Sequence, residues 1–306
     1  MAHADPIRVL VTGASGCIGR AAVTALRSAG ATVFATSRSG TGHRADLLDP
    51  AARQGLLAEA SATHLLHLAW ITDHGAYWTS RENIIWLAAS ADLLAHFAAA
   101  GGRRAVGAGS CAEYDWRSLP PGPIDEAAPI DPQTAYGACK AGLHHIGVAM
   151  AGAGGFGYAW GRIFHTYGAG ENENRLVAHV ARALAAGREA KCGPGAYLRD
   201  YMDFRDVGSA FAALVISDVE GPVNIASGEG TTVDSVVATL ESIAGSRGRI
   251  ETGALSRYDT APAALVADTG RLRDEVGFAP TISLARGLAD AYAYWRGDTG
   301  TSSGEN

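Results

Sequence analysis

The sequence lacks closely spaced cysteines, an excess of basic residues and long apolar runs. Its four cysteines, Cys17, Cys111, Cys139 and Cys192, are widely separated, so none forms the close pair that zinc or redox motifs need. The formal net charge of -6 argues against a general nucleic-acid binder, which needs a basic face to displace counterions from phosphates. No apolar run reaches the roughly 18 residues of a membrane-spanning helix, and residues 1–6 show no export signal. We therefore expect a cytoplasmic protein with reduced thiols, no metal site and no membrane partner.

Short apolar segments alternate with helical patterns through most of the chain. Strands are predicted at 7–11, 32–36, 64–68, 105–108 and 158–164, and the alanine-rich segment 84–100 is predicted to be a helix. This alternation is typical of an α/β protein with a parallel, doubly wound sheet. With 306 residues, of which 47% are hydrophobic, the chain has room for one large sheet domain and a smaller lobe.

The turn after the first predicted strand is rich in glycine. It contains Gly13, Gly16 and Gly19 at intervals of three, directly between a strand and a helix. Glycine lets the backbone approach a pyrophosphate, and the amides at the start of the following helix point toward the anion. The turn therefore predicts a dinucleotide site that also involves its other residues, Ser15, Cys17 and Ile18.

The end of the second predicted strand distinguishes between the two nicotinamide cofactors. A site for NAD places a carboxylate there to bind the ribose hydroxyls, whereas this sequence reads Thr36-Ser37-Arg38. The guanidinium of Arg38 can pair with the additional phosphate of NADP, and Ser37 can add a hydroxyl donor. The residues favour NADP(H) over NAD(H), and the alternative is that Arg38 is only a solvated loop residue.

Three residues form a candidate catalytic set. Tyr136 and Lys140 are four residues apart in a predicted helix, which places the phenol and the ammonium on one face. A neighbouring ammonium stabilises a phenolate and brings the pKa of tyrosine toward the working range of a proton-transfer group. Ser110 follows a predicted strand at the sheet edge where ligands bind, and it can donate a hydrogen bond to the reacting oxygen.

In this order and spacing, residues 12–19, Ser110, Tyr136 and Lys140 resemble the extended short-chain dehydrogenase/reductase family of nucleotide-sugar epimerases, dehydratases and ketoreductases. The resemblance covers nearly the whole chain. It implies a Rossmann-type doubly wound sheet with a smaller C-terminal substrate-binding lobe, and further cofactor contacts from Tyr136, Lys140 and the residues Asp46, Leu47, Leu68, Ala69 and Asn83. The expected division is 1–164 plus about 199–227 for the dinucleotide-binding domain, 165–198 and 228–298 for the lobe, and 299–306 for a flexible tail.

The same resemblance implies a nucleotide-sugar substrate and a homodimer. Arg199 matches the arginine that grips the substrate diphosphate, and Arg257 is a candidate second clamp, with a surface position as its alternative. His165 stands where the family usually has asparagine, so it either contacts the substrate or is a packed structural histidine. Trp70, Trp78, Trp116 and His74 either line the sugar pocket or belong to the core.

The residues after Ser110 bear on the reaction. Family members that remove water resemble one another in having an acid pair directly after the catalytic Ser or Thr, where this chain has Cys111 and Ala112, although Glu113 is close by. The lack of this pair argues against dehydration, and Arg38 favours an NADPH that is consumed and exchanged, so we expect a reductase of 4-keto or 4-keto-6-deoxy sugar nucleotides. The alternative is a nucleotide-sugar 4-epimerase with tightly bound NAD. A 4,6-dehydratase and a non-catalytic NADPH sensor are the less favoured alternatives.

Overall fold

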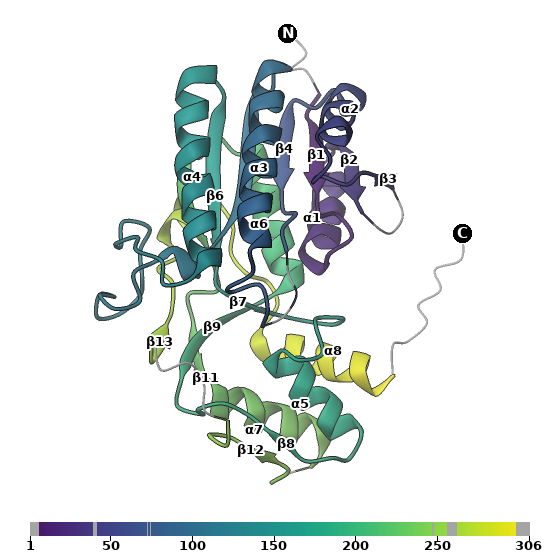
Figure 1. The fold of residues 1–306 in the computed structure, drawn as a ribbon. Coiled ribbons are helices and arrows are strands. Elements are labelled where there is room, and N and C mark those ends of the chain that lie inside the picture. Colours follow the sequence, from purple (N-terminus) through teal and green to yellow (C-terminus); the bar gives the residue numbers. More distant parts are fainter. Residues whose placement is uncertain are drawn as a thin grey trace.

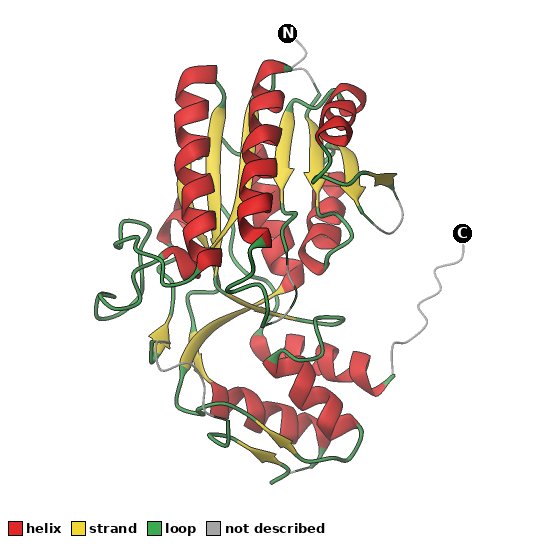
Figure 2. Ribbon diagram, in the orientation of Figure 1, coloured by secondary structure: helices red, strands yellow, loops and turns green. Residues whose placement is uncertain are grey.

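The computed structural model describes residues 6–38, 42–71, 73, 75–246, 248–255 and 262–297. Its largest element is a seven-stranded sheet in the order β10-β6-β5-β4-β1-β2-β3, with every neighbouring pair parallel. The strands are β1 (Arg8–Thr12), β2 (Thr32–Ser37), β3 (His43–Arg44), β4 (His64–His67), β5 (Arg104–Ser110), β6 (Gly157–Ile163) and β10 (Gly221–Ile225). The predicted parallel, Rossmann-type sheet is confirmed (Figures 1 and 2).

Helices cover both faces of this sheet. Side chains of α1 (Cys17–Ser28) and α6 (Phe204–Ile216) pack into the core on one face. Those of α2 (Pro50–Ala60), α3 (Glu82–Ala99) and α4 (Ala135–Gly154) pack on the other. In α1 the buried residues Gly19, Ala22, Val23 and Leu26 recur at helical spacing, which explains why this segment forms an amphipathic helix against the strands.

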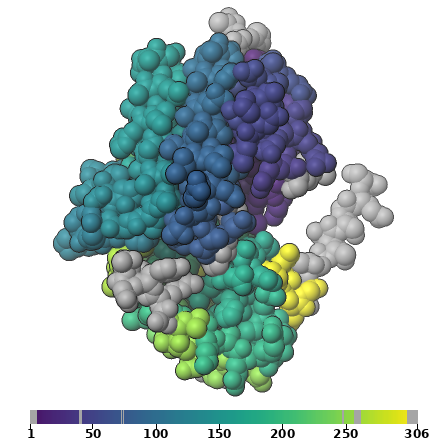
Figure 3. Space-filling view, in the orientation of Figure 1, coloured from purple at the N-terminus to yellow at the C-terminus, as the bar shows by residue number. Residues whose placement is uncertain are grey.

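A smaller group of elements lies below the carboxyl ends of the large sheet's strands in the view of Figure 1. Its four-stranded sheet consists of β7 (His165–Tyr167), β9 (Leu198–Asp203), β11 (Gly230–Thr232) and β13 (Ala264–Leu265). A two-stranded sheet contains β8 (Ala190–Lys191) and β12 (Ile250–Glu251), and the helices are α5 (Leu176–Ala185), α7 (Val233–Ala244) and α8 (Leu284–Arg296). Figure 3 shows the early, purple-to-teal residues above the green and yellow residues of this part.

The chain crosses between the two sheets more than once, and residues 199–203, expected in the dinucleotide-binding domain, lie in β9 of the smaller sheet. β9 lies in the smaller sheet, whereas α6 and β10, which come soon after it, lie with the larger one. The predicted tail, 299–306, falls outside the described residues. Among the described residues, no helix has the length and apolar character that crossing a bilayer requires.

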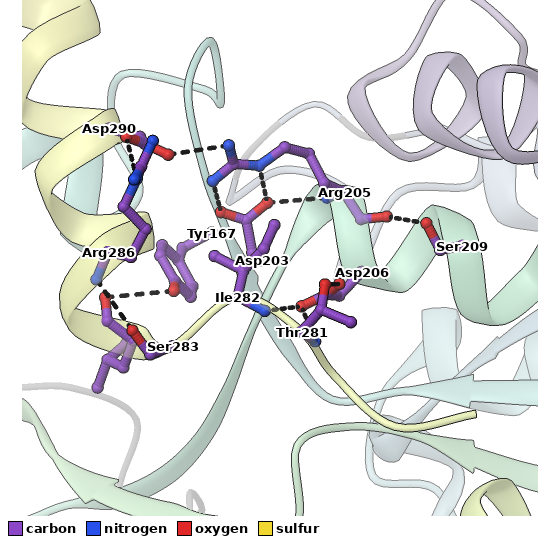
Figure 4. A network of polar contacts seen from close by, with 11 residues as sticks. Tyr167, Asp203, Arg205, Asp206, Ser209, Thr281, Ile282, Ser283, Arg286 and Asp290 are labelled. Carbon is purple, nitrogen blue, oxygen red and sulfur yellow. Dashed lines mark hydrogen bonds and ion pairs between the residues drawn. The ribbon is translucent and has the colours of Figure 1, made fainter.

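The start of α6 connects the two parts of the chain through buried carboxylates (Figure 4). Asp203 accepts hydrogen bonds from the guanidinium of Arg205, which also forms an ion pair with Asp290 of α8 at 2.9 Å. Asp206 accepts bonds from the backbone N–H groups of Thr281 and Ile282 at 3.0 and 2.8 Å. These bonds hold the segment leading into α8 against the base of α6, so the smaller part is anchored beside the edge where the large sheet ends.

Candidate active site

Three predicted catalytic residues meet at the carboxyl end of β5. Ser110 is the last residue of β5, and a short 3-10 turn, η1 (Cys111–Glu113), follows it. Tyr136 and Lys140 lie in the first two turns of α4, whose N-terminus is capped by Thr134 through a bond from the Gly137 N–H at 3.0 Å. The cap begins the helix at a fixed residue, and this places the phenol beside the end of the strand.

Tyr136 is half-buried within a group of aromatic rings. Its ring contacts Tyr77 and Trp78 edge to face, at centroid distances of 4.9 and 5.7 Å. Burial raises the pKa of Tyr136 above its usual value, the neighbouring Tyr77 adds to the rise, and the hydroxyl of Ser110 opposes it. Burial therefore favours the protonated phenol in this arrangement, and taking up a proton needs a neighbouring cation that favours the phenolate.

Lys140 lies deeper than Tyr136. Its ammonium donates a hydrogen bond to the carbonyl oxygen of Ala108 at 2.8 Å and lies 5.8 Å from the ring centre of Tyr136. Burial lowers the pKa of Lys140 to about 7, while Glu113 acts in the opposite direction. Because this pKa is close to neutral, small changes in the surroundings of Lys140 change the fraction of the side chain that is charged at pH 7.

Glu113 has a structural role that the sequence interpretation did not predict. Its carboxylate is fully buried and accepts bonds from the N–H of Ser110 at 2.7 Å, the indole of Trp160 at 2.9 Å and the guanidinium of Arg162 at 3.1 Å. Burial raises the pKa of Glu113, and Arg162 opposes that rise. The sequence pattern Ser-x-x-Glu at Ser110 and Glu113 could have predicted this role, because it is the spacing of a capping box. The structure contains that capping box.

The glycine turn lies at the end of β1, where the order of strands reverses in the sheet. A Cβ atom on Gly19 would be 2.2 Å from the carbonyl oxygen of Gly13, so the turn and α1 can pack this closely only with glycine. Gly16 is the exposed N-cap of α1, and no side chain caps the helix there. The backbone amides in the first turn of α1 are suited to bind the pyrophosphate of a dinucleotide. Ser15, Cys17 and Ile18 lie beside these amides.

The predicted cofactor residues Ser37, Arg38, Asp46 and Leu47 lie at the end of β2 and just after β3. Ser37 ends β2, and the exposed Arg38 follows it. Asp46 is exposed and its carboxylate accepts the N–H of Leu48 at 3.0 Å, whereas Leu47 is buried in the core. β2 itself contains no carboxylate, so the end of this strand carries Ser37 and Arg38 rather than an acidic residue.

Leu68, Ala69 and Asn83 follow β4. The hydroxyl of Thr12 accepts the N–H groups of Leu68 and Ala69 at 3.2 and 3.3 Å, which ties this segment to the end of β1 beside the glycine turn. Asn83 is buried, and its amide donates to the carbonyl oxygens of Tyr77 and Ser80. Asn83 therefore fixes the loop that carries Tyr77.

The predicted substrate residues lie on the smaller sheet. His165 of β7 pairs with Tyr201 of β9, and their rings are 5.9 Å apart. Arg199 of β9 is buried, and its positive charge lowers the pKa of Cys111, next to Ser110, against the larger effect of burial. The guanidinium of Arg199 donates hydrogen bonds to the carbonyl oxygens of Leu198 and Ala263 at 2.8 and 3.2 Å, whereas Arg257 lies outside the described residues.

The aromatic candidates separate into two groups. Trp78 and Trp116 have rings 6.2 Å apart, and the indole of Trp116 donates to the carbonyl oxygen of Cys111 at 3.0 Å, so both lie near Ser110 and Tyr136. Trp70 belongs to the core, where it packs over Lys140. His74 lies outside the described residues.

Comparisons with known proteins agree on one family. The model of the NAD dependent epimerase/dehydratase family matches residues 9–226. A UDP-glucose 4-epimerase of Corynebacterium glutamicum is 26% identical over 323 residues, covering 94% of this chain and 95% of that protein. The structure of MoeE5 in complex with UDP-glucose and NAD is 26% identical with a TM-score of 0.82, covering 95% of this chain and 99% of that one. The structure of RMD from Pseudomonas aeruginosa complexed with NADPH has the same TM-score and coverage at 23% identity, which shows a common fold.

The pair formed by Glu113 and Arg162 predicts a large effect on stability. Glu113→Ala leaves a buried guanidinium without its carboxylate, so we expect urea unfolding to show a loss of about 3–5 kcal/mol. The exposed pair of Asp274 and Arg273 provides the control, and Asp274→Ala should leave the unfolding midpoint unchanged. Equally small effects of the two substitutions would contradict a structural role for Glu113.

Proposed function

The chain belongs to the NAD-dependent epimerase/dehydratase family, and we propose that it catalyses the 4-epimerisation of a nucleotide sugar. The observation that carries this proposal is the meeting of Ser110, Tyr136 and Lys140 at the carboxyl end of β5, on the side of the sheet where the glycine turn follows β1. The relatives named above support the substrate class, because the Corynebacterium protein is a UDP-glucose 4-epimerase and MoeE5 binds UDP-glucose.

In this proposal the side chains of the site move a proton and hold a reacting oxygen. When bound, the nicotinamide supplies a hydride acceptor and donor. Tyr136 takes the proton of the sugar hydroxyl as the carbon is oxidised and returns it when that carbon is reduced. Ser110 donates a hydrogen bond to the same oxygen, and the ammonium of Lys140 stabilises the phenolate of Tyr136 while it exists.

Dehydration fits this site less well. Removing water across two carbons needs an acid and a base beside the sugar, and the positions after Ser110 are Cys111 and Ala112. Glu113, the nearest carboxylate in sequence, is fully buried and bonded to Arg162, Trp160 and the N–H of Ser110. It is therefore turned into the protein and away from any substrate.

Ketoreduction is the second candidate, and Arg38 favours it. A reductase exchanges its cofactor after each turnover, and an arginine at the end of β2 matches NADPH, which is the cofactor in the RMD structure. An epimerase returns the hydride to its own product and consumes no NADPH. The cofactor preference and the reaction therefore need separate tests, and we propose NADP(H) as the preferred cofactor.

The substrate would lie between the two sheets in this proposal. Arg199 supplies positive charge and can pair with a diphosphate, and Arg257 is a proposed second contact. Trp78 and Trp116 offer flat apolar surfaces beside Tyr136 for the sugar ring, and His165 lies in the strand next to Arg199.

Substitution of the proposed proton-transfer residue tests the mechanism. Tyr136→Phe should lower turnover by about a hundredfold to ten-thousandfold, because the proton has no carrier, while cofactor binding remains. Turnover is measured as interconversion of UDP-glucose and UDP-galactose by chromatography, and as oxidation of NADPH with a 4-keto-6-deoxy sugar nucleotide. Tyr294→Phe, at an exposed tyrosine of α8, is the control. If Tyr136→Phe keeps wild-type rates in both assays, Tyr136 is not the proton carrier.

Removal of the Arg38 guanidinium tests the cofactor proposal. Arg38→Ala should weaken binding of NADPH about tenfold to a hundredfold, because a charge-assisted bond to the phosphate is lost, and should change binding of NADH little. Fluorescence titration of both cofactors measures this, with Arg27→Ala as a control at the last turn of α1. Equal weakening of both cofactors would show that Arg38 does not contact the additional phosphate.

We also propose that the protein is a homodimer that associates through α3 and α4. Ile84 and Ile85 of α3 are 62% and 53% exposed, and Val148 of α4 is 49% exposed, so both helices expose large apolar side chains. Ile85→Asp should convert the dimer to a monomer in sedimentation experiments, whereas Ile216→Asp, at an exposed isoleucine of α6, should not. A wild-type protein that sediments as a monomer at all concentrations would overturn the proposal.

A further inference from the structure

Trp70 covers the ammonium group of Lys140. The Nζ atom lies 3.9 Å from the centre of the indole ring, and both residues are buried, at 8% exposure for Trp70 and 4% for Lys140. The hydrogen bond from Lys140 to Ala108 at 2.8 Å uses one of the three ammonium protons. The face of the Trp70 ring thus lies against the buried ammonium of Lys140.

The indole ring is held in this orientation by its own hydrogen bond. Its Nε1 donates to the side-chain oxygen of Asn83 at 2.9 Å, and the amide of Asn83 is bonded to Tyr77 and Ser80. The ring of Trp86 packs beside it at a centroid distance of 6.2 Å. Trp70 therefore presents a fixed face to Lys140.

We propose that Trp70 is a positioning residue for the reaction, and that the negative face of its ring keeps Lys140 charged and in place beside Tyr136. This inference rests on the proposed role of Lys140 in the function above. A cation within about 6 Å of a tryptophan face is attracted by the ring quadrupole, most strongly where water is excluded.

The groups around Lys140 determine whether its side chain carries a charge. Burial disfavours the ammonium, and Glu113 of η1 favours it. From β4, His67 faces the same space, and burial followed by the charge of Lys140 lowers its pKa to about 3, so it is neutral and adds no repulsion. Cys139 of α4 also favours the ammonium, and the ring centre of Tyr136 in the same helix lies 5.8 Å from Nζ. Glu113 and Cys139 thus oppose the effect of burial on Lys140, and we assign the same direction to the ring face of Trp70.

The lysine content of the chain allows a direct test, because Lys140 and Lys191 are the only two lysines. We would record the pH titration of isotope-labelled lysine side chains by NMR in proteins with tryptophan, monofluorotryptophan or tetrafluorotryptophan at position 70 alone. Fluorination weakens the negative face of the ring while nearly preserving its size. The pKa of Lys140 should fall stepwise, by about one unit or a tenfold change in proton dissociation across the series. Lys191, which is exposed, should not change.

The outcomes separate this inference from the proposed function. A pKa of Lys140 that stays constant across the series would overturn the role of Trp70, whatever the activity. A stepwise fall in this pKa supports it, and the loss of turnover at high pH should then move to lower pH in parallel. If the pKa falls while the pH profile of turnover stays fixed, the Trp70 contact stands and the proposed role of Lys140 in catalysis is wrong.

Discussion

The buried ion pair between Glu113 and Arg162 organises the end of the sheet on which the site is built. Removing two charges from water costs free energy, and this cost is offset only when both charges are paired and fully hydrogen-bonded. Here the carboxylate also accepts the N–H of Ser110 and the indole of Trp160, while the guanidinium donates to the hydroxyl of Tyr114 at 3.3 Å. The backbone of Ser110 is thereby fixed by the same bonds that satisfy the charges.

The network extends from this pair toward the last strand of the sheet. Tyr114 donates to the side chain of Asn224 in β10 at 2.6 Å, and the amide of Asn224 donates to the carbonyl oxygens of Ile124 and Asp268. The long loop after η1 is therefore tied to the sheet, and it carries Trp116 toward the catalytic turn. A functional site on loops gains its precision from such buried attachments.

Burial has opposite effects on the two groups proposed to handle the proton. It raises the pKa of Tyr136 and lowers that of Lys140 to about 7, so both groups are pushed toward their neutral forms. Catalysis by a phenolate needs both in their charged forms. Ser110 opposes the rise in the pKa of Tyr136, Glu113 and Cys139 oppose the fall in the pKa of Lys140, and the indole of Trp70 lies over the ammonium.

The sequence by itself determined the family, the parallel sheet and the set of Ser110, Tyr136 and Lys140, because glycine spacing, strand periodicity and a four-residue helical spacing are local patterns. It favoured a reductase, whereas the relatives favour the epimerase that it held as the alternative. Only the tertiary structure placed Glu113 against Arg162 and Trp70 over Lys140. These contacts join segments that are far apart in the sequence and that come together only because of the strand order. The charge state and the pKa of each group depend on its neighbours and its burial, so the sequence alone cannot predict them.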